Sequence, residues 1–330
     1  MRPTGSPVSP AFPKSSNKTK CGAPDSESRS CPVWLRPRTS NEVVHIIWIV
    51  VVAQNLVPSF VNFQRLSAGM EEAARLALWE RLYERPNQEL LNAYFTGFGS
   101  RLDLSAALDK LDAIAPRLEQ VADITPALLV DVVGKVEARF GWDEFEPIPF
   151  VVLVGTFGSS AWTTTVGGRQ LSFIAAELLP RVPVDGALIA HETAHGIHHR
   201  MRTGDWQPIV GLKLFEEAIA MASAELECPS CSDLDLVAFG GENDAWLSAC
   251  EQSWASVRSE LRNVLMSNDP TDLGWFFARP ERRPAGASFP HRIGYYAALV
   301  LARKLVTDVS LRDMVGWDPT HALTTVNTHL

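Results

Sequence analysis

The chain has 330 residues, of which 46% are hydrophobic and 21% are charged, a composition typical of a folded globular protein with a substantial core. Its formal net charge of −8 comes without a cluster of Lys and Arg, which argues against nucleic acid as a partner. The five cysteines are an odd and sparse set that does not resemble a disulfide framework, so we expect a reducing compartment and a cytoplasmic protein.

The beginning of the chain differs from the rest in composition. Residues 1–42 are rich in Pro, Ser, Thr, Lys and Arg and lack apolar periodicity, which predicts either a disordered extension or a start assigned too far upstream. The apolar run at 43–53 has about half of the roughly 20 residues that a membrane-spanning helix needs, and it lies too far along the chain for a signal peptide. We therefore expect a buried β-strand that opens the folded domain, and no membrane span.

Helical periodicity follows from residue 56 to residue 140, with helices expected at 70–83, 104–121 and 126–140. Thr125-Pro126 resembles an N-cap followed by a proline at the first helical position, which predicts that a new helix begins there. Residues 43–145 are thus predicted to form a mainly helical N-terminal part of the domain, without a chemical motif of its own.

The spacing of the apolar residues is no longer helical after residue 146, where the predicted catalytic region, 146–330, begins. Residues 149–155 are apolar and bounded by Pro and Gly, which indicates a buried strand, and 162–166 and 170–174 form a hairpin around Gly167-Gly168. Asp185 can cap a helix that runs to about Met201. Further helices are expected at 209–227, 243–266 and 291–307.

The helix after Asp185 contains the pattern His191-Glu-Thr-Ala-His195. Residues four apart lie on one helical face, so both imidazoles can reach a single cation. Catalytic zinc takes three protein ligands and a water, and Glu192 is placed so that its carboxylate can reach that water and act as general base. The neighbouring Leu188, Ile189 and Ala190 predict a buried helix, where unpaired polar groups would be costly.

A third zinc ligand must come from elsewhere in the chain. The metzincin continuation HExxHxxGxxH fails, because His198 stands at the glycine position and Met201 at the third histidine position. A glutamate on a second helix is the other common solution, and Glu216 and Glu217 lie in an otherwise apolar helix. Adjacent residues point about 100° apart on a helix, so one of these two carboxylates should face the metal.

This arrangement resembles the gluzincin metallopeptidases, which pair HExxH with a helix-borne glutamate about twenty residues further on. Aligning their Leu-x-Glu-Gly-x-Ala motif with residues 215–220 implies Glu217 as the ligand, although Ala218 replaces the usual glycine. From about Val50 to Asp318 the chain is similar to the YjaZ-like predicted zinc-dependent proteases. That likeness depends on the HExxH segment, the Glu216-Glu217 helix and residues 290–296.

The resemblance also implies a catalytic role for Tyr295, which matches the Gly-Tyr segment of that family. A tyrosine hydroxyl can donate a hydrogen bond to the tetrahedral oxyanion. Tyr296 and His291 compete for the same role, and a buried aromatic residue without one is the alternative. Gluzincins pair an edge strand with the substrate backbone, and the resemblance implies that strand at Gln170–Ile174.

Other metal-binding residue types lie nearby. His198 and His199 follow His195 closely, but three histidines of one helix rarely converge on one ion, so we expect them outside the metal site or at the surface. Cys228-Pro-Ser-Cys231 is a lone CxxC, which leaves open a redox role or a structural zinc shared with Cys250.

Taken together, these patterns predict a mostly helical α+β protein with a zincin-like catalytic region and a small sheet beside the HExxH helix. The expected activity is that of a Zn²⁺-dependent hydrolase, a metallopeptidase acting on a peptide or protein substrate. Two alternatives are a zinc-binding regulatory or degenerate protein without turnover, and an interaction module in which HExxH arises by chance.

Overall fold

The N-terminal part of the described chain is built almost entirely of helices. The computed structural model describes residues 52–102, 104–142, 146–179, 183–239 and 241–330, all of which belong to one compact unit. The predicted extension at 1–42, and most of the apolar run at 43–53, lie outside these residues. The N-terminal helices are α2 (Val57–Ser67), α3 (Glu72–Trp79), the π-helical η1 (Glu80–Glu84), the 3₁₀ turn η2 (Arg85–Asn87), α4 (Gln88–Gly97), α5 (Leu104–Asp112) and α6 (Ala115–Phe140).

The long helix α6 corrects the prediction of a helix start at Thr125-Pro126. The break comes earlier, between α5 and α6, and α6 runs through Pro126 without interruption. Pro116 occupies the first turn of α6, so the preference of proline for a helix start is met there. Because α6 packs against both α2 and α7, tertiary contacts compensate for the hydrogen bond that Pro126 removes.

Four short strands form one mixed sheet, in the order β1-β2-β4-β3. The strand β1 pairs in parallel with β2, β2 pairs in parallel with β4, and β4 and β3 form the antiparallel hairpin. The turn of this hairpin is made by Gly167 and Gly168, both at positive φ, as the hairpin prediction requires. The strands are β1 (Val52–Asn55), β2 (Phe150–Leu153), β3 (Ala161–Val166) and β4 (Arg169–Ala175).

The order of the strands overturns one expectation. Gln170–Ile174 belongs to β4, which is hydrogen-bonded to a strand on each side and therefore cannot be the edge that accepts another chain. The edge strand of the hairpin is β3, which also packs against α7. The prediction failed because the parallel pairing of β4 with β2 leaves no local trace in the sequence.

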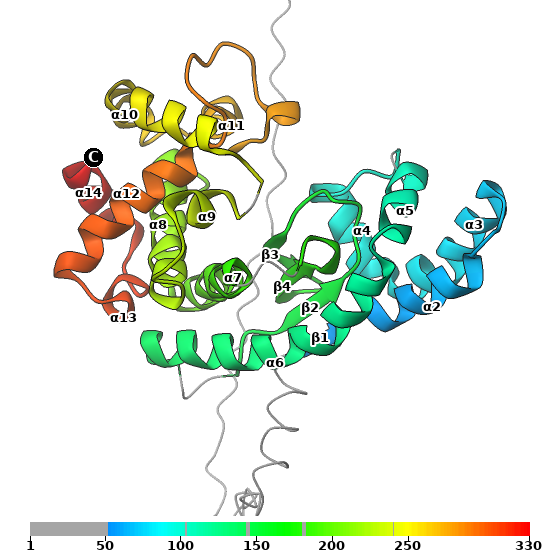
Figure 1. Cartoon of the computed structure of the whole chain (residues 1–330). Coiled ribbons are helices and arrows are strands. Elements are labelled where there is room, and N and C mark those ends of the chain that lie inside the picture. The colour runs from blue at the N-terminus through cyan, green and yellow to red at the C-terminus, as the bar shows by residue number, and fades with distance from the viewer. Residues whose placement is uncertain (1–51, 103, 143–145, 180–182, 240) are drawn as a thin grey trace, which may run out of the picture. The chain divides into compact units, whose positions relative to one another are not determined.

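The rest of the chain is helical and surrounds α7, with helices α8, α10 and α12 close to their predicted positions. Figure 1 shows α7 between the sheet on one side and α8 on the other, with α6 running along both. The structure thus confirms a mostly helical α+β fold with a small sheet beside the HExxH helix. The elements are η3 (Ala176–Leu178), α7 (Val184–Met201), α8 (Val210–Glu227), α9 (Asp233–Ala238), α10 (Asp244–Val264), α11 (Pro270–Phe277), η4 (Pro280–Arg282), α12 (Ile293–Asp308), α13 (Leu311–Met314) and α14 (Pro319–His329).

The start of α7 differs from the prediction in one detail. Pro183 is the N-cap residue and makes no side-chain cap, whereas Asp185 lies inside the first turn and is buried. An acidic residue there still suits the positive end of the helix dipole. Among the described residues, no helix combines the length and the apolar character that crossing a bilayer requires.

Candidate metal centre

The helix α7 carries two histidines into the interior of the protein. Leu188, Ile189 and Ala190 are buried, and the packing of α7 against α8 includes a hydrogen bond from the Ser223 hydroxyl to the Ala190 carbonyl. His191 is 3% exposed, and His195 follows one helical turn later on the same face. The predicted burial of the HExxH helix is therefore confirmed.

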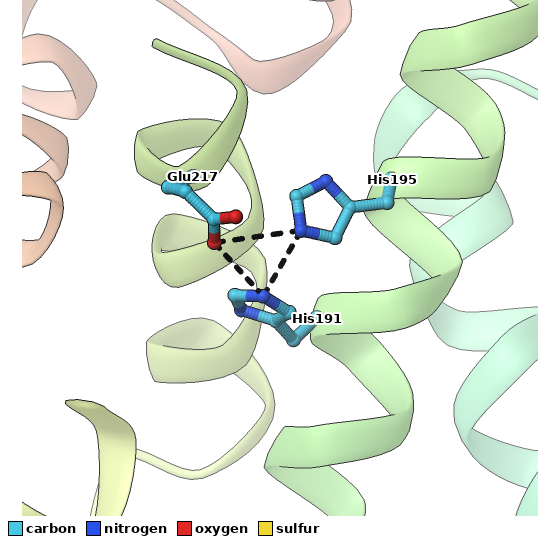
Figure 2. Close-up of side chains that lie close together, drawn as sticks. All are labelled: His191, His195 and Glu217. Carbon is cyan, nitrogen blue, oxygen red and sulfur yellow. Dashed lines mark hydrogen bonds and ion pairs between the residues drawn. The ribbon is translucent and has the colours of Figure 1, made fainter. Parts of the chain in front are cut away.

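Glu217 reaches the two imidazoles from α8 (Figure 2). Its Oε2 atom lies 3.2 Å from Nε2 of His191 and 3.5 Å from Nε2 of His195, and the two Nε2 atoms are 3.0 Å apart. The structure thus brings together the three residues that the sequence nominated as metal ligands, and it identifies them as a group that could hold an ion.

The three donor atoms have the spacing that a zinc ion requires. Donors of a tetrahedral zinc site with bonds of about 2.0–2.1 Å lie about 3.3–3.4 Å from one another. The three distances here, 3.0, 3.2 and 3.5 Å, bracket that value. Oε2 of Glu217 is buried and finds no partner with ordinary hydrogen-bond geometry among the described residues. Two imidazole nitrogens and one carboxylate oxygen turned toward a common point therefore fit a divalent cation.

Glu216, the competing ligand, points elsewhere. Its Oε1 atom accepts a hydrogen bond of 2.7 Å from Nη1 of Arg202, in a pair whose side chains are each 21% exposed. Glu217 is 2% exposed. Because successive residues of a helix point about 100° apart, the two carboxylates face different partners. Glu217 is the one that faces the histidines.

The electrostatic environment favours the metal-binding protonation state at two of the three residues of the cluster. Burial lowers the pKa of His191, with Glu217 acting in the opposite direction. Burial also acts to lower the pKa of His195, but the negative charges of Glu217 and Glu192 outweigh it and raise the pKa. Burial would raise the pKa of Glu217, yet the charges of Lys213 and His195 hold it well below its usual range. Metal ligands must be a carboxylate and neutral imidazoles, and Glu217 and His191 are biased toward those states.

Glu192, the predicted general base, lies beside the cluster at 6% exposure. Its Oε2 atom accepts a hydrogen bond of 2.9 Å from the Thr163 hydroxyl on the edge strand β3. The Ser172 hydroxyl lies 2.9 Å from Thr163 and can donate to it in turn. This chain of hydroxyls fixes the direction of a carboxylate whose charge acts on both imidazoles.

Tyr295 lies in the first turn of α12, close to the cluster. Burial raises the pKa of its hydroxyl, the negative charge of Glu217 raises it further, and Lys213 and Arg292 act in the opposite direction. Its two competitors face other groups: Tyr296 packs on Trp254, and Nε2 of His291 lies 3.0 Å from Oε1 of Glu242. Tyr295 thus interacts electrostatically with Glu217 of the cluster, whereas these contacts of Tyr296 and His291 are with other groups.

The other histidines and the cysteines lie apart from the cluster. His198 is buried between Trp206 and Phe215, whereas His199 is exposed and contacts Arg202. Cys228 and Cys231 form a disulfide at the end of α8, and Cys250 is a buried free thiol. A structural zinc held by these three cysteines, one of the options left open by the sequence, is thus not what the structure forms.

The sequence interpretation missed three residues that contact this site. Thr163 holds Glu192, the Phe239 ring packs edge-on against His191 with centroids 5.1 Å apart, and Lys213 contacts Glu217. Lys213 stands four residues before Glu217 on the same helical face, which is a signal the sequence contains. Thr163 and Phe239 come from distant segments and leave no local signal.

Three possible ligand atoms thus lie around one point, and the Glu192 carboxylate and the Tyr295 hydroxyl interact electrostatically with the residues that carry them. These are the kinds of group that hydrolysis by a metal-activated water would use. Comparisons with models of protein families, with curated proteins and with solved structures find no match to this chain. The functional assignment therefore depends on the geometry of the site.

Proposed function

We propose that this protein is a zinc-dependent hydrolase of the gluzincin type, with a peptide or protein as substrate. The observation that carries the proposal is the convergence of His191, His195 and Glu217 with donor spacings of 3.0–3.5 Å, beside the carboxylate of Glu192. A structural zinc site has no need of a base and is commonly closed by a fourth protein ligand. The described residues offer three ligands at this point.

Each residue of the site has a distinct part in the proposed reaction. A zinc ion held by the three ligands supplies a Lewis acid and lowers the pKa of a water molecule. Glu192 takes the proton from the attacking water and passes it to the leaving amine. The Tyr295 hydroxyl donates a hydrogen bond to the oxygen of the scissile carbonyl as negative charge develops there.

The edge strand β3 supplies a surface for the substrate backbone. It carries Thr163, whose hydroxyl holds Glu192, so a peptide paired with this strand would lie next to the base. Adding an extended peptide to a free sheet edge supplies main-chain hydrogen bonds that depend little on side chains.

The proposal is tested by metal analysis and by one substitution. The purified protein should contain about one zinc ion per chain, and it should cleave members of a mixed peptide library. Glu192→Gln should lower kcat by about 10²–10⁴-fold, the range typical of lost general-base catalysis, with the zinc content unchanged.

Glu216→Gln is the matched control, because it removes a carboxylate from the adjacent position outside the cluster, and it should keep both zinc and turnover. A protein that never retains zinc contradicts the proposal entirely. Zinc retained without turnover of any peptide would instead favour a zinc-binding regulatory protein.

A further inference from the structure

A lysine side chain reaches Glu217, the proposed third ligand, from the same helix. Nζ of Lys213 lies 2.6 Å from Oε1 of Glu217, a contact made possible because residues four apart are neighbours on a helical face. The Lys213 side chain is 36% exposed, whereas that of Glu217 is 2% exposed. The lysine therefore extends from the protein surface to a buried carboxylate.

The two oxygens of Glu217 have different partners. Oε1 contacts the lysine, and Oε2 is turned toward the two imidazoles at 3.2 and 3.5 Å. A carboxylate can rotate about its last bond, and a metal can take one or both of its oxygens. A cation fixed on Oε1 removes that freedom and leaves one oxygen for ligation.

The neighbouring acid shows that this pairing is specific. Glu216 has its own cation, Arg202, at 2.7 Å, although both glutamates belong to the same turn of α8. Around them Leu212, Leu214 and Phe215 are buried, so Lys213 is a charged residue within an apolar stretch. A buried carboxylate without a cation would be strongly disfavoured before any metal binds.

We propose that Lys213 is a positioning residue for the metal site, which holds Oε1 of Glu217 so that Oε2 alone is presented to a divalent cation. The inference rests on the proposed zinc site and adds to it a fourth residue that does not touch the metal. It has two consequences: Lys213 prearranges the site before metal binds, and it restricts Glu217 to a single ligand atom.

The first consequence is tested by metal affinity, which is independent of turnover. Lys213→Met keeps most of the side-chain volume and removes the cation, and it should weaken zinc binding by about 10–100-fold, the usual effect of removing a group that orients a ligand. Lys213→Arg retains a donor and should bind zinc more tightly than Lys213→Met. Zinc affinity is measured by competition with a chromophoric chelator, and circular dichroism verifies that each variant is folded.

The second consequence has a spectroscopic signature. Cobalt(II) replaces zinc in such sites, and its visible absorption is stronger in four-coordinate than in five-coordinate geometry. The Co²⁺ form of Lys213→Met should absorb more weakly than the Co²⁺ wild-type protein, because the released Oε1 can also bind. If Lys213→Met is unfolded, Lys213→Leu, which likewise cannot donate to Oε1, provides the same two measurements.

Arg202→Met is the matched control, because it removes the corresponding cation from Glu216, and it should leave zinc affinity and the Co²⁺ spectrum unchanged. Equal zinc affinity in the wild type and Lys213→Met, with identical cobalt spectra, would overturn the role of Lys213 and leave the zinc site intact. A wild-type protein that binds neither metal would instead overturn the proposed function.

Discussion

Adjacent residues of one helix can have unrelated roles, as Glu216 and Glu217 demonstrate. Both are acidic, and they are separated by one peptide unit, yet one pairs with Arg202 near the surface and the other faces one buried and one half-buried imidazole. The difference arises from the rotation of about 100° between successive residues of a helix. Charge alone therefore does not identify a ligand; direction and burial do.

The role proposed for Tyr295 depends on a single oxygen atom, its hydroxyl, and can be tested by removing that atom. Tyr295→Phe removes the hydroxyl and keeps the ring that packs against Phe277. We expect kcat to fall by about 10–10³-fold, up to the cost of removing one oxyanion donor in well-studied enzymes, with little change in KM or zinc content. Steady-state kinetics and metal analysis measure these quantities.

Tyr296→Phe serves as the comparison, because that residue follows directly in α12 but packs on Trp254. It should leave the rate unchanged. A Tyr295→Phe enzyme as fast as the wild type would show that the phenol does not stabilise the oxyanion, and the residue would then be a packing aromatic.

The sequence predicted that His191, His195 and Glu217 belong together from the local spacing of the two histidines and from the resemblance of the Glu217 helix to a known motif. Two histidines four residues apart on a helix must share a face, and the choice of Glu217 followed from the likeness to a known second motif. The residues that contact Glu192 and His191 were not predictable from such local spacing. Thr163 reaches Glu192 from a strand 29 residues earlier, and Phe239 reaches His191 from the end of α9, so both contacts depend on the tertiary fold.

At the level of whole elements, the contact between α7 and Ile148, in the segment that leads into β2, is close enough to test by adding one methyl group. A Cβ atom at Gly196 would lie 2.7 Å from Cγ2 of Ile148, a buried residue two positions before the strand. Such overpacking costs about 1–3 kcal/mol and exceeds the gain in helix propensity from Ala. Gly196→Ala should therefore lower the free energy of unfolding, measured by chemical denaturation.

Gly134 in α6 is a suitable comparison for Gly196. It is exposed within a helix, and a Cβ atom added there would meet nothing within 4 Å. Gly134→Ala should raise the free energy of unfolding by about 0.5–1 kcal/mol through helix propensity alone. Shifts of the same sign in the two variants would contradict the close packing of α7 beside the sheet.

Elements were predictable from sequence where the pattern was strong and local. The helices α8, α10 and α12 and the hairpin β3–β4 fall where the periodicity and the Gly167-Gly168 turn placed them. The course of α6 through Pro126 and the central place of β4 were not predictable. Both features depend on contacts between residues that are distant in sequence, and such contacts can outweigh what the local sequence favours.

Considered as a whole, the molecule contains a buried carboxylate that should make its stability depend on pH. Glu177 is fully buried beneath the loop after β2 and accepts hydrogen bonds from the backbone N–H groups of Gly155 and Phe157. Burial raises the pKa of its carboxyl to about 7, although these hydrogen bonds and the charge of Arg117 act to lower it.

The sign of the pH effect follows from proton uptake. Between the pKa of an unfolded Glu, about 4.3, and the folded value, the native state retains a proton that the unfolded chain has lost. The contribution of Glu177 to stability is thus present at low pH, decreases as pH rises through this interval, and is lost above about pH 7. The decrease amounts to about 4 kcal/mol, at 1.36 kcal/mol for each pKa unit between the unfolded and the folded value.

Denaturation with urea at a series of pH values measures this dependence. Glu177→Gln, which cannot ionise, should show a smaller decrease in the free energy of unfolding between about pH 4.5 and pH 7 than the wild type does. The slopes are compared rather than the absolute stabilities, because the substitution also disturbs the two backbone hydrogen bonds. Parallel profiles would contradict the raised pKa of Glu177.

The path of the chain from Cys228 to Phe239 has a mechanical consequence. This segment leaves the end of the helix that carries Glu217, is joined to itself by the Cys228–Cys231 disulfide, and returns through α9 to place a phenylalanine ring against His191. Phe239 adopts the left-handed conformation, which is rare for a bulky residue, so its position is imposed by its surroundings. The segment that follows the helix of Glu217 thus packs against His191, and insertions or deletions between Cys228 and Phe239 would move the Phe239 ring away from the imidazole.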